Sequence, residues 1–187
     1  MIQPENFTPT IENIVSAGQV ADSIDLAVLP EKLPGSSFSG KFPGAVYHME
    51  WPRSVALVFA SGKIVLTGLS DLDDIPQALR NLMDALADAG IACHACPQVG
   101  IKNIICSYDL GMPCNLVRIM MALMDHEMVE YEPESFPGLV CRISDPKMVF
   151  LIFASGKVII TGGKNMADIN RGIGVLRTKL GIAGSIG

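Results

Sequence analysis

The sequence has little that would place the chain in a membrane or export it. No run of 18 apolar residues occurs among its 187 residues, because glycine, lysine, aspartate or proline interrupts every candidate. Residues 1–10 contain neither the basic segment nor the apolar core of a signal peptide. Five cysteines, an odd number, fit a reducing compartment better than a disulfide framework. We therefore expect an intracellular chain without a membrane anchor.

The sequence also lacks a basic excess and lacks the motifs of nucleotide chemistry. A formal net charge of −5 argues, taken alone, against a nucleic-acid-binding protein. Two Ser-Gly-Lys triplets occur, but neither sits in a complete phosphate-binding loop motif. No nucleophile–base pair and no paired carboxylates stand out, so we expect no enzyme activity and no cofactor. Hydrophobic residues make up 49 % of the chain and charged residues 18 %, which is typical of a globular fold with ample core.

An internal repeat organises the chain. Residues 57–68 read LVFASGKIVLTG and residues 151–162 read LIFASGKVIITG, with eight of twelve positions identical. The two strings are 94 positions apart, and the same offset pairs the Phe-Pro-Gly triplets that begin at Phe42 and Phe136. IENI at 11–14 has its counterpart in IKNI at 101–104. Two copies predict a pseudo-twofold molecule. We assign the first repeat to residues 1–92 and the second to residues 93–187, with the join near residues 92–100.

Each repeat predicts one unit of strands followed by a long helix. The expected strands cover residues 11–17, 44–50, 54–60 and 63–67, with counterparts at 101–107, 138–143, 148–154 and 157–161. Ser-Gly-Lys is typical of a tight hairpin connection. The helices follow Asp71 and Asn165, which are suitable N-caps, and end at Gly90 and Gly181. The predicted fold class is α/β (α+β), with one antiparallel sheet of about ten strands.

The predicted sheet has one apolar face too many. Both parities of Val55–Ala60 and of Val149–Ala154 are apolar, whereas one long helix per repeat covers only one face. The other face carries aliphatic groups, two amides and two hydroxyls, and no acid. We expect on it Asn13, Val15, Leu57, Phe59, Val65, Thr67, Asn103, Ile105, Leu151, Phe153, Ile159 and Thr161. Such a surface fits the minor groove of A·T-rich DNA, which offers only acceptors, but a dimer interface or a larger core explains the pattern equally well.

The strings described above, taken together, resemble the TATA-box-binding protein family of the archaeal type, over about residues 11–182. They are IENIV and IKNII, two FPG turns, two FASGK hairpins, both TG pairs, and YEPESFPG at 131–138. The resemblance implies a saddle with one curved sheet and helices on its convex face. It also implies a general transcription initiation factor that binds and bends A·T-rich (TATA) promoter DNA. The acidic side chains would then lie on the helices, away from the groove, and the salt dependence of binding would be shallow.

The resemblance also assigns roles to individual residues. The DNA-intercalating wedges match Phe42, Phe59, Phe136 and Phe153. The residues on the groove floor match Asn13, Val15, Leu57, Val65, Thr67, Asn103, Ile105, Leu151, Ile159 and Thr161. The phosphate-binding cations match Arg53, Lys63, Arg142, Lys147, Lys157 and Lys164. Glu132 and Glu134 match an acidic loop that contacts transcription factor B. The expected partners are double-stranded promoter DNA and transcription factor B, at the nucleoid in the cytoplasm of an archaeal cell.

The first repeat departs from the family pattern. His48, Glu50 and Ser70 stand where basic residues are usual, so we expect weaker phosphate contacts in the first half. The alternative is a divergent saddle paralogue with weak or no DNA binding, acting as a protein-interaction or regulatory subunit. A third interpretation is an accessory domain of a nucleic-acid enzyme. Dimerisation of the DNA-free protein through its concave face stays open.

Three further signals have simpler interpretations. Cys93-His94-Ala95-Cys96 has the spacing of a zinc site, and Cys106 and Cys114 would have to supply a second pair. We interpret the segment as a loop with two unpaired thiols and expect no metal. His126, beside two acids, is interpreted as part of a solvated helix face. The methionines of this region are expected in core packing; they are Met120, Met121, Met124 and Met128.

Overall fold

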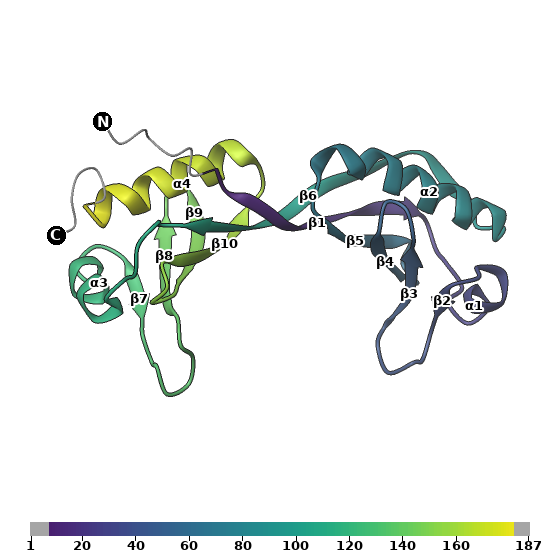
Figure 1. Cartoon of the computed structure of the whole chain (residues 1–187). Coiled ribbons are helices and arrows are strands. Elements are labelled where there is room, and N and C mark those ends of the chain that lie inside the picture. Colours follow the sequence, from purple (N-terminus) through teal and green to yellow (C-terminus); the bar gives the residue numbers. More distant parts are fainter. Residues whose placement is uncertain (1–7, 182–187) are drawn as a thin grey trace. The chain divides into compact units, whose positions relative to one another are not determined.

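The computed structural model describes residues 8–181 and contains one ten-stranded sheet (Figure 1). Residues 1–7, on which part of the expectation about targeting rests, lie outside the described residues. The strands follow one another across the sheet as β2-β3-β4-β5-β1-β6-β10-β9-β8-β7. Their bounds are β1 Thr10–Ala21, β2 Ser36–Ser37, β3 Gly44–Met49, β4 Ser54–Phe59, β5 Lys63–Leu69, β6 Cys93–Asp109, β7 Met128–Glu130, β8 Leu139–Ser144, β9 Lys147–Ile152 and β10 Lys157–Gly163. The strand pairs with a defined register are antiparallel, so the predicted sheet is confirmed.

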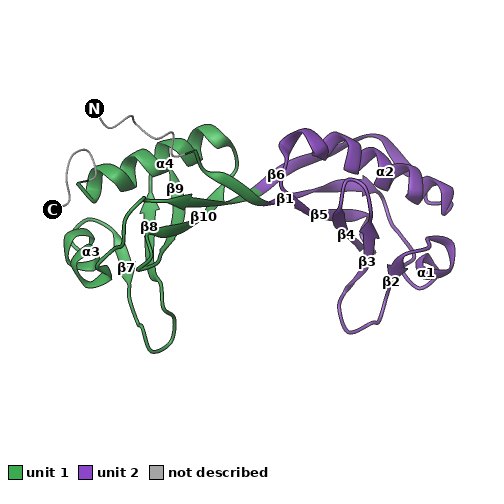
Figure 2. Cartoon of the chain, viewed as in Figure 1, with its two compact units in different colours: residues 1–12, 103–187 green, residues 13–102 purple. Residues whose placement is uncertain are grey.

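The chain forms two compact units that share two long strands (Figure 2). Unit 1 comprises residues 1–12 and 103–187, and unit 2 comprises residues 13–102. Strand β1 passes from unit 1 to unit 2 after Glu12, and strand β6 passes from unit 2 to unit 1 after Lys102. Each unit therefore contains part of the first strand of both predicted repeats. The repeat boundary between residues 92 and 93 stays a prediction about the sequence.

In unit 2 one long helix covers one face of the strands. Helix α2 (Ile75–Asp88) follows a 3₁₀ turn, η1 (Leu72–Asp74), whose N-cap Asp71 accepts a hydrogen bond from the Asp73 N–H at 2.9 Å. Its buried residues recur every four positions, which places them on one side of the helix; they are Ala78, Leu82 and Leu86. The buried residues of β4 and β5 complete this core; they are Ala56, Val58, Ile64 and Leu66. Helix α1 (Leu29–Lys32) is a single turn.

Unit 1 repeats this arrangement with its own helices, α3 (Leu116–Leu123) and α4 (Met166–Lys179). The predicted N-cap Asn165 accepts a hydrogen bond from the Asp168 N–H at 2.8 Å. Helix α4 then buries Ile169, Ile173 and Leu176. Its opposite partners are the buried residues of β9 and β10, which are Met148, Phe150, Ile152, Val158 and Ile160. Gly172 lets the helix approach these strands, because a Cβ there would lie 2.7 Å from the Met148 sulfur.

The two predicted Ser-Gly-Lys hairpins are confirmed. In unit 2 the Gly62 N–H donates to the Phe59 carbonyl at 2.9 Å, and in unit 1 the Gly156 N–H donates to the Phe153 carbonyl at 2.9 Å. These turns join β4 to β5 and β9 to β10, so that Leu57 stands opposite Val65 and Leu151 opposite Ile159. The hairpin registers therefore fix which residues share a face.

Three interpretations of local structure were wrong. His126, interpreted as part of a helix face, lies in the turn after α3, where its N–H donates to the Leu123 carbonyl at 3.0 Å. Residues 93–100, interpreted as a join with a loop, are the first half of β6. The reason is that β1 extends to Ala21, and the polar backbone groups along its edge pair with the next strand of the sheet. The methionines were expected in the core, yet Met121 on α3, Met124 at its C-cap and Met128 on β7 are exposed, and the buried residues of α3 are Leu116 and Leu123.

Between residues 8 and 181, no helix is long and apolar enough to cross a membrane. Across the same part of the chain, no group of three or more histidine, cysteine and acidic side chains is arranged to hold a metal ion.

Candidate nucleic-acid interface

Unit 2 leaves the second face of its strands uncovered by helices. Along β4, buried residues alternate with half-buried ones, so that Val55, Leu57 and Phe59 share the face opposite the core. Val65 and Thr67 of β5 and Asn13 and Val15 of β1 are also half-buried. We call this set the open face of unit 2; it consists of Asn13, Val15, Leu57, Phe59, Val65 and Thr67.

Unit 1 has an equivalent open face, built from β6, β9 and β10. All of its members are half-buried, whereas the residues that alternate with them include the buried Ile104, Cys106, Ile152, Val158 and Ile160. The open face of unit 1 consists of Asn103, Ile105, Leu151, Phe153, Ile159 and Thr161. The predicted floor residues therefore group on one side of the strands in each unit.

An asparagine–threonine pair lies at the corresponding place on each open face. In unit 2, Asn13 Nδ2 donates to Thr67 Oγ1 at 3.1 Å, while the Gly68 N–H donates to Asn13 Oδ1 at 2.8 Å. In unit 1, Asn103 Nδ2 donates to Thr161 Oγ1 at 2.9 Å, and the Gly162 N–H donates to Asn103 Oδ1 at 2.7 Å. Both glycines have a left-handed backbone, with φ of 92° and 98°. The two Thr-Gly strings thus exist because this conformation favours glycine.

The backbone N–H fixes the orientation of each amide. Because it occupies the amide oxygen, the NH₂ end carries two hydrogens, and the threonine takes only one of them. Each open face therefore presents one fixed hydrogen-bond donor, surrounded by aliphatic side chains.

The four predicted wedges form two phenylalanine pairs. Phe42 and Phe59 of unit 2 meet edge to face, with ring centroids 5.9 Å apart, and Phe136 and Phe153 of unit 1 do so at 5.8 Å. In each pair the residue from the Phe-Pro-Gly turn is the more exposed one, at 39 % for Phe42 and 37 % for Phe136. Exposure of this degree is unusual for two packed aromatic rings, since each offers a large apolar area to a partner.

The glycine of each Phe-Pro-Gly turn lies under its ring pair. A Cβ on Gly44 would be 2.9 Å from Phe42 Cε1 and 3.2 Å from Phe59 Cε1. A Cβ on Gly138 would be 2.7 Å from Phe136 Cε1 and 3.0 Å from Phe153 Cε1. The third residue of the motif is therefore glycine because both rings occupy the space that a side chain would need.

The predicted phosphate-binding cations are all exposed. Lys63 and Lys157 are the first residues of β5 and β10, directly after the two hairpin turns. Arg142 lies on β8, with Nε 3.9 Å from the Glu130 carboxylate. Lys147 and Lys164 line one hollow of unit 1 together with Asp168. Arg53 lines the equivalent hollow of unit 2, next to Gly68, together with His48 and Glu50.

These two equivalent hollows carry different charge. The unit 1 hollow has two lysines and one acid, whereas the unit 2 hollow has one arginine, one acid and a histidine. The departures noted in the first repeat thus lie at one place in the structure. This distribution agrees with the expectation of stronger phosphate contacts in the second half, which stays a prediction.

Glu132 and Glu134 are exposed in the loop between β7 and β8. The N–H groups of Ser135 and Phe136 both donate to the Glu132 carbonyl at 2.9 Å. One turn therefore positions the two acids and the exposed phenylalanine of unit 1.

The structure places one acid where the sequence analysis expected none. The Ser107 hydroxyl donates to Glu12 Oε1 at 2.5 Å, and Ser107 stands opposite the floor residue Ile159 in the β6–β10 ladder. The carboxylate therefore lies at the open face of unit 1. Strand alternation counted from Asn13 hid this position, because Glu12 belongs to unit 1 and Asn13 to unit 2. The sequence carries no signal for this position, because the change of unit within β1 is visible only in the structure.

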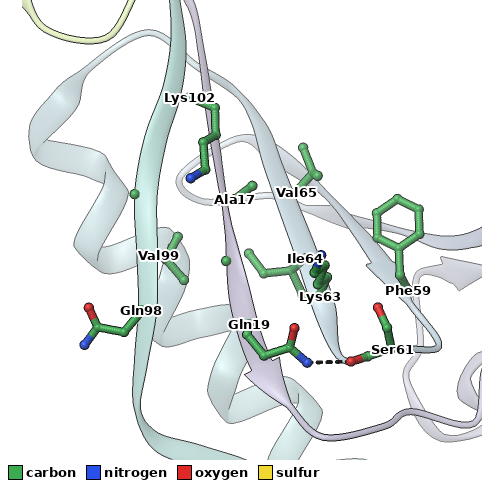
Figure 3. Close-up of a pocket in the computed structure, with 12 residues that line it drawn as sticks. Ala17, Gln19, Phe59, Ser61, Lys63, Ile64, Val65, Gln98, Val99 and Lys102 are labelled. Carbon is green, nitrogen blue, oxygen red and sulfur yellow. Dashed lines mark hydrogen bonds between the residues drawn. The ribbon is translucent and has the colours of Figure 1, made fainter.

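Lys102 has the equivalent position in unit 2. It lines a hollow with Ala17, Val65 and Phe59, and Figure 3 shows its side chain running along β6 on the side of Ala17. Ala17 stands opposite Val65 in the β1–β5 ladder, as Ser107 stands opposite Ile159 in unit 1. Within the described residues Lys102 forms no ion pair.

Four of the five cysteines have raised pKa values, namely Cys93, Cys106, Cys114 and Cys141. Burial, followed by the negative charge of Glu12, raises the pKa of Cys106 to about 11. Burial and then Glu127 raise the pKa of Cys141 to about 11, which Lys179 partly offsets. Burial also raises the pKa of Cys93, and burial followed by Asp109 raises that of Cys114. Thiols with raised pKa values are inert, because the thiolate is the reactive form.

Comparison with known proteins identifies relatives over nearly the whole chain. The family described as "Transcription factor TFIID (or TATA-binding protein, TBP)" matches residues 8–89 and 98–181. TATA-box-binding protein 1 of Methanosarcina acetivorans is 43 % identical over 171 residues, which is 91 % of this chain and 93 % of that protein. TATA-box-binding protein 2 of Haloferax volcanii is 40 % identical over 178 residues, 95 % of each chain.

A solved structure has the same fold. The structure of Methanococcus jannaschii TBP superposes with a TM-score of 0.82 at 36 % identity, covering 94 % of this chain and 99 % of that one. The predicted fold class is therefore confirmed at the level of the whole architecture. The family match falls in two segments, in agreement with the internal repeat.

Proposed function

The chain belongs to the TATA-binding protein family of transcription factors, and we propose that its two open faces bind the minor groove of A·T-rich promoter DNA at transcription initiation. Membership of this family makes the chain a general transcription factor and not an enzyme. The observation that carries the proposal is the pair of fixed amide donors, each within an aliphatic face.

The hydrogen-bonding pattern of the open faces fits A·T base pairs. In the minor groove these pairs present only the acceptors A N3 and T O2, whereas G·C adds the N2 amino donor. The free N–H of Asn13 and that of Asn103 would each donate to such an acceptor. A guanine amino group facing Leu57 or Leu151 would lose its water without gaining an acceptor, at a cost of roughly 1–3 kcal/mol.

The two phenylalanine pairs would act as wedges. Apolar side chains that enter a base step unstack it and kink the duplex, and the TBP family is itself the standard example of this mode of binding. Phe42 and Phe136 are the exposed members, and Phe59 and Phe153 support them from the ends of the hairpins. We propose intercalation by both members of each pair.

The cations would supply limited phosphate binding. Six exposed cations are the candidates, and Glu50 and Asp168 stand beside three of them. Affinity would therefore depend mainly on apolar burial and DNA bending, so that the slope of log affinity against log salt is shallow. The unit 1 hollow, with Lys147 and Lys164, would hold a phosphate more firmly than the hollow with Arg53.

The acidic loop would bind transcription factor B. Glu132 and Glu134 are exposed in unit 1. The corresponding segment of unit 2, residues 36–44, has no acid and carries Lys41. A contact through one loop only would give a pseudo-symmetric protein a direction. Charge reversal at both acids should weaken the ternary complex with transcription factor B and leave the binary DNA complex unchanged.

A gel-shift and bend assay on an A·T-rich promoter duplex tests the proposal. The protein would be compared with Phe136→Ala and Phe153→Ala, and with Met121→Ala as the control for loss of an exposed apolar side chain on α3. We expect bent, specific complexes that the phenylalanine substitutions abolish and the methionine substitution preserves.

Absence of binding at every salt concentration, even with transcription factor B, would refute the promoter role and favour an interaction subunit. The proposed location at the nucleoid would then also be refuted. Dimerisation of the free protein through the same apolar faces is a separate proposal, which sedimentation with and without DNA would test.

A further inference from the structure

The two open faces differ at one equivalent position, which holds an acid in unit 1 and a lysine in unit 2. Glu12 and Lys102 occupy the same place in the strings IENI and IKNI. Glu12 reaches Ser107, which is paired with Ile159 of the open face of unit 1. Lys102 lines the hollow with Ala17, which is paired with Val65 of the open face of unit 2. Since Ser107 and Ala17 are themselves equivalent in register, the comparison is between matched sites.

The Glu12 carboxylate has capacity for further hydrogen bonds. It is exposed and accepts one hydrogen bond, from Ser107, through Oε1. An ionised carboxylate offers about four acceptor positions and no donor. Ser107 stands opposite Ile159 in the ladder, and Glu12 takes part in none of the ion pairs of the described residues. The carboxylate would therefore seek a donor from whatever covers the face.

An A·T-rich minor groove supplies no such donor. Its floor carries the acceptors A N3 and T O2, which a carboxylate repels. The guanine N2 amino group is the donor that a minor groove can present, and it would satisfy Glu12. Lys102 has the opposite character, because an ammonium donates three hydrogen bonds and accepts none. It matches the acceptors of A·T pairs directly.

We propose that Glu12 makes this chain prefer a base pair with a minor-groove amino group at one position of its DNA site, while Lys102 keeps the equivalent position of the other half selective for A·T. The inference rests on the proposed minor-groove function and specifies which sequence that function selects. The preferred site would then be asymmetric, with a single G·C pair on the side bound by unit 1. Such a site would orient the protein on DNA without any contribution from transcription factor B.

Base analogues separate the amino group from the rest of the base pair. Diaminopurine·T adds the minor-groove amino group to an A·T pair, and inosine·C removes it from a G·C pair. We would scan each analogue through every position of an A·T-rich site and measure affinity for the wild type, Glu12→Gln, Lys102→Gln and Lys102→Glu. Glu12→Gln retains an acceptor for Ser107, and its urea midpoint would verify that the fold is intact.

The wild type should show one position where the amino group raises affinity relative to Glu12→Gln by about tenfold, the size of a good base-edge contact. Inosine·C should abolish the effect at that position. Lys102→Glu should create a second such position in the other half, and Lys102→Gln should not. Identical position profiles for the wild type and Glu12→Gln would overturn the inference while the proposed function stands. Failure of the wild type to bind any duplex would instead remove the proposed function.

Discussion

Alanine at Gly138 should impair DNA bending while leaving the fold nearly intact. The added Cβ would lie 2.7 Å from Phe136 Cε1 and 3.0 Å from Phe153 Cε1, whereas ordinary contact begins at 3.4 Å. The ring of Phe136 must therefore move by about 0.7 Å and that of Phe153 by about 0.4 Å. The backbone itself accepts alanine, because Gly138 is not among the residues with positive φ.

The cost should fall on function because the rings can move outward. Phe136 is 37 % exposed, so its displacement disturbs little of the core, and we expect a loss of about 1 kcal/mol in the free energy of unfolding. A functional contact, however, tolerates displacement of only about 0.5 Å. We therefore expect roughly tenfold weaker binding to an A·T-rich duplex and a smaller bend angle.

Fluorescence measurement of the bend, together with urea unfolding, distinguishes these effects. Gly174→Ala on α4 is the matched control, because no atom lies within 4 Å of its added Cβ and alanine favours a helix. It should stabilise the protein slightly and leave bending unchanged. A Gly138→Ala protein that binds and bends DNA like the wild type would refute the wedge role of this ring pair. A loss of stability above about 3 kcal/mol would show that the rings belong to the core.

Three further predictions follow from other parts of the structure. Asn103→Asp keeps the acceptor for the Gly162 N–H but removes the outward donor, so DNA affinity in an anisotropy titration should fall at least about tenfold. The control Asn115→Asp, at the N-cap of α3, should leave the affinity unchanged. Lys164→Gln should reduce the slope of log affinity against log salt by about 0.9, and an unchanged slope would exclude Lys164 from phosphate binding. Because burial raises the pKa values of Cys106 and Cys141 to about 11, the folded protein retains more protons than the unfolded one between about pH 9 and 11, so stability should decrease as pH rises through that window. Urea midpoints should fall less steeply over this window in a variant with alanine at both cysteines, and equal slopes would contradict the assignment.

Much of the fold could be predicted because each turn and strand pattern of the first repeat occurs again in the second. The two copies of the hairpin string fix a turn, a register and a pair of apolar strands at once. Apolar residues on both parities of Val55–Phe59 then require a second apolar face, which the alternation of buried and half-buried residues in β4 confirms. The wedge and floor residues could be grouped on this face for the same reason, although their roles stay predictions.

Features that depend on long-range pairing could not be predicted. The first half of β6 has the composition of a loop, with Pro97 and Gly100, and becomes a strand because β1 lies beside it. Glu12 precedes Asn13, so strand alternation predicts that its side chain points to the face opposite that of Asn13. The two residues belong to different compact units, and the prediction does not hold across that change. The exposed methionines at and after α3 have the hydrophobicity of core residues, and helical spacing does not tell which side of a helix has a partner.

The residues that the two units share and those that differ between them suggest different roles in DNA binding and in orientation on the DNA. Asn, Thr, Gly and the phenylalanine pair recur in both units with nearly the same geometry, so under the proposed function they would bind A·T pairs equally in either orientation. Any preference for one orientation must then come from positions that differ, and each factor of ten requires about 1.4 kcal/mol. Such differences include Glu12 against Lys102, Glu50 near Arg53 against the two lysines of unit 1, and the acidic loop at Glu132. Under the proposed function the first two would act on DNA alone, so orientation should already be biased in the binary complex, and contact with transcription factor B through the acidic loop should strengthen the bias.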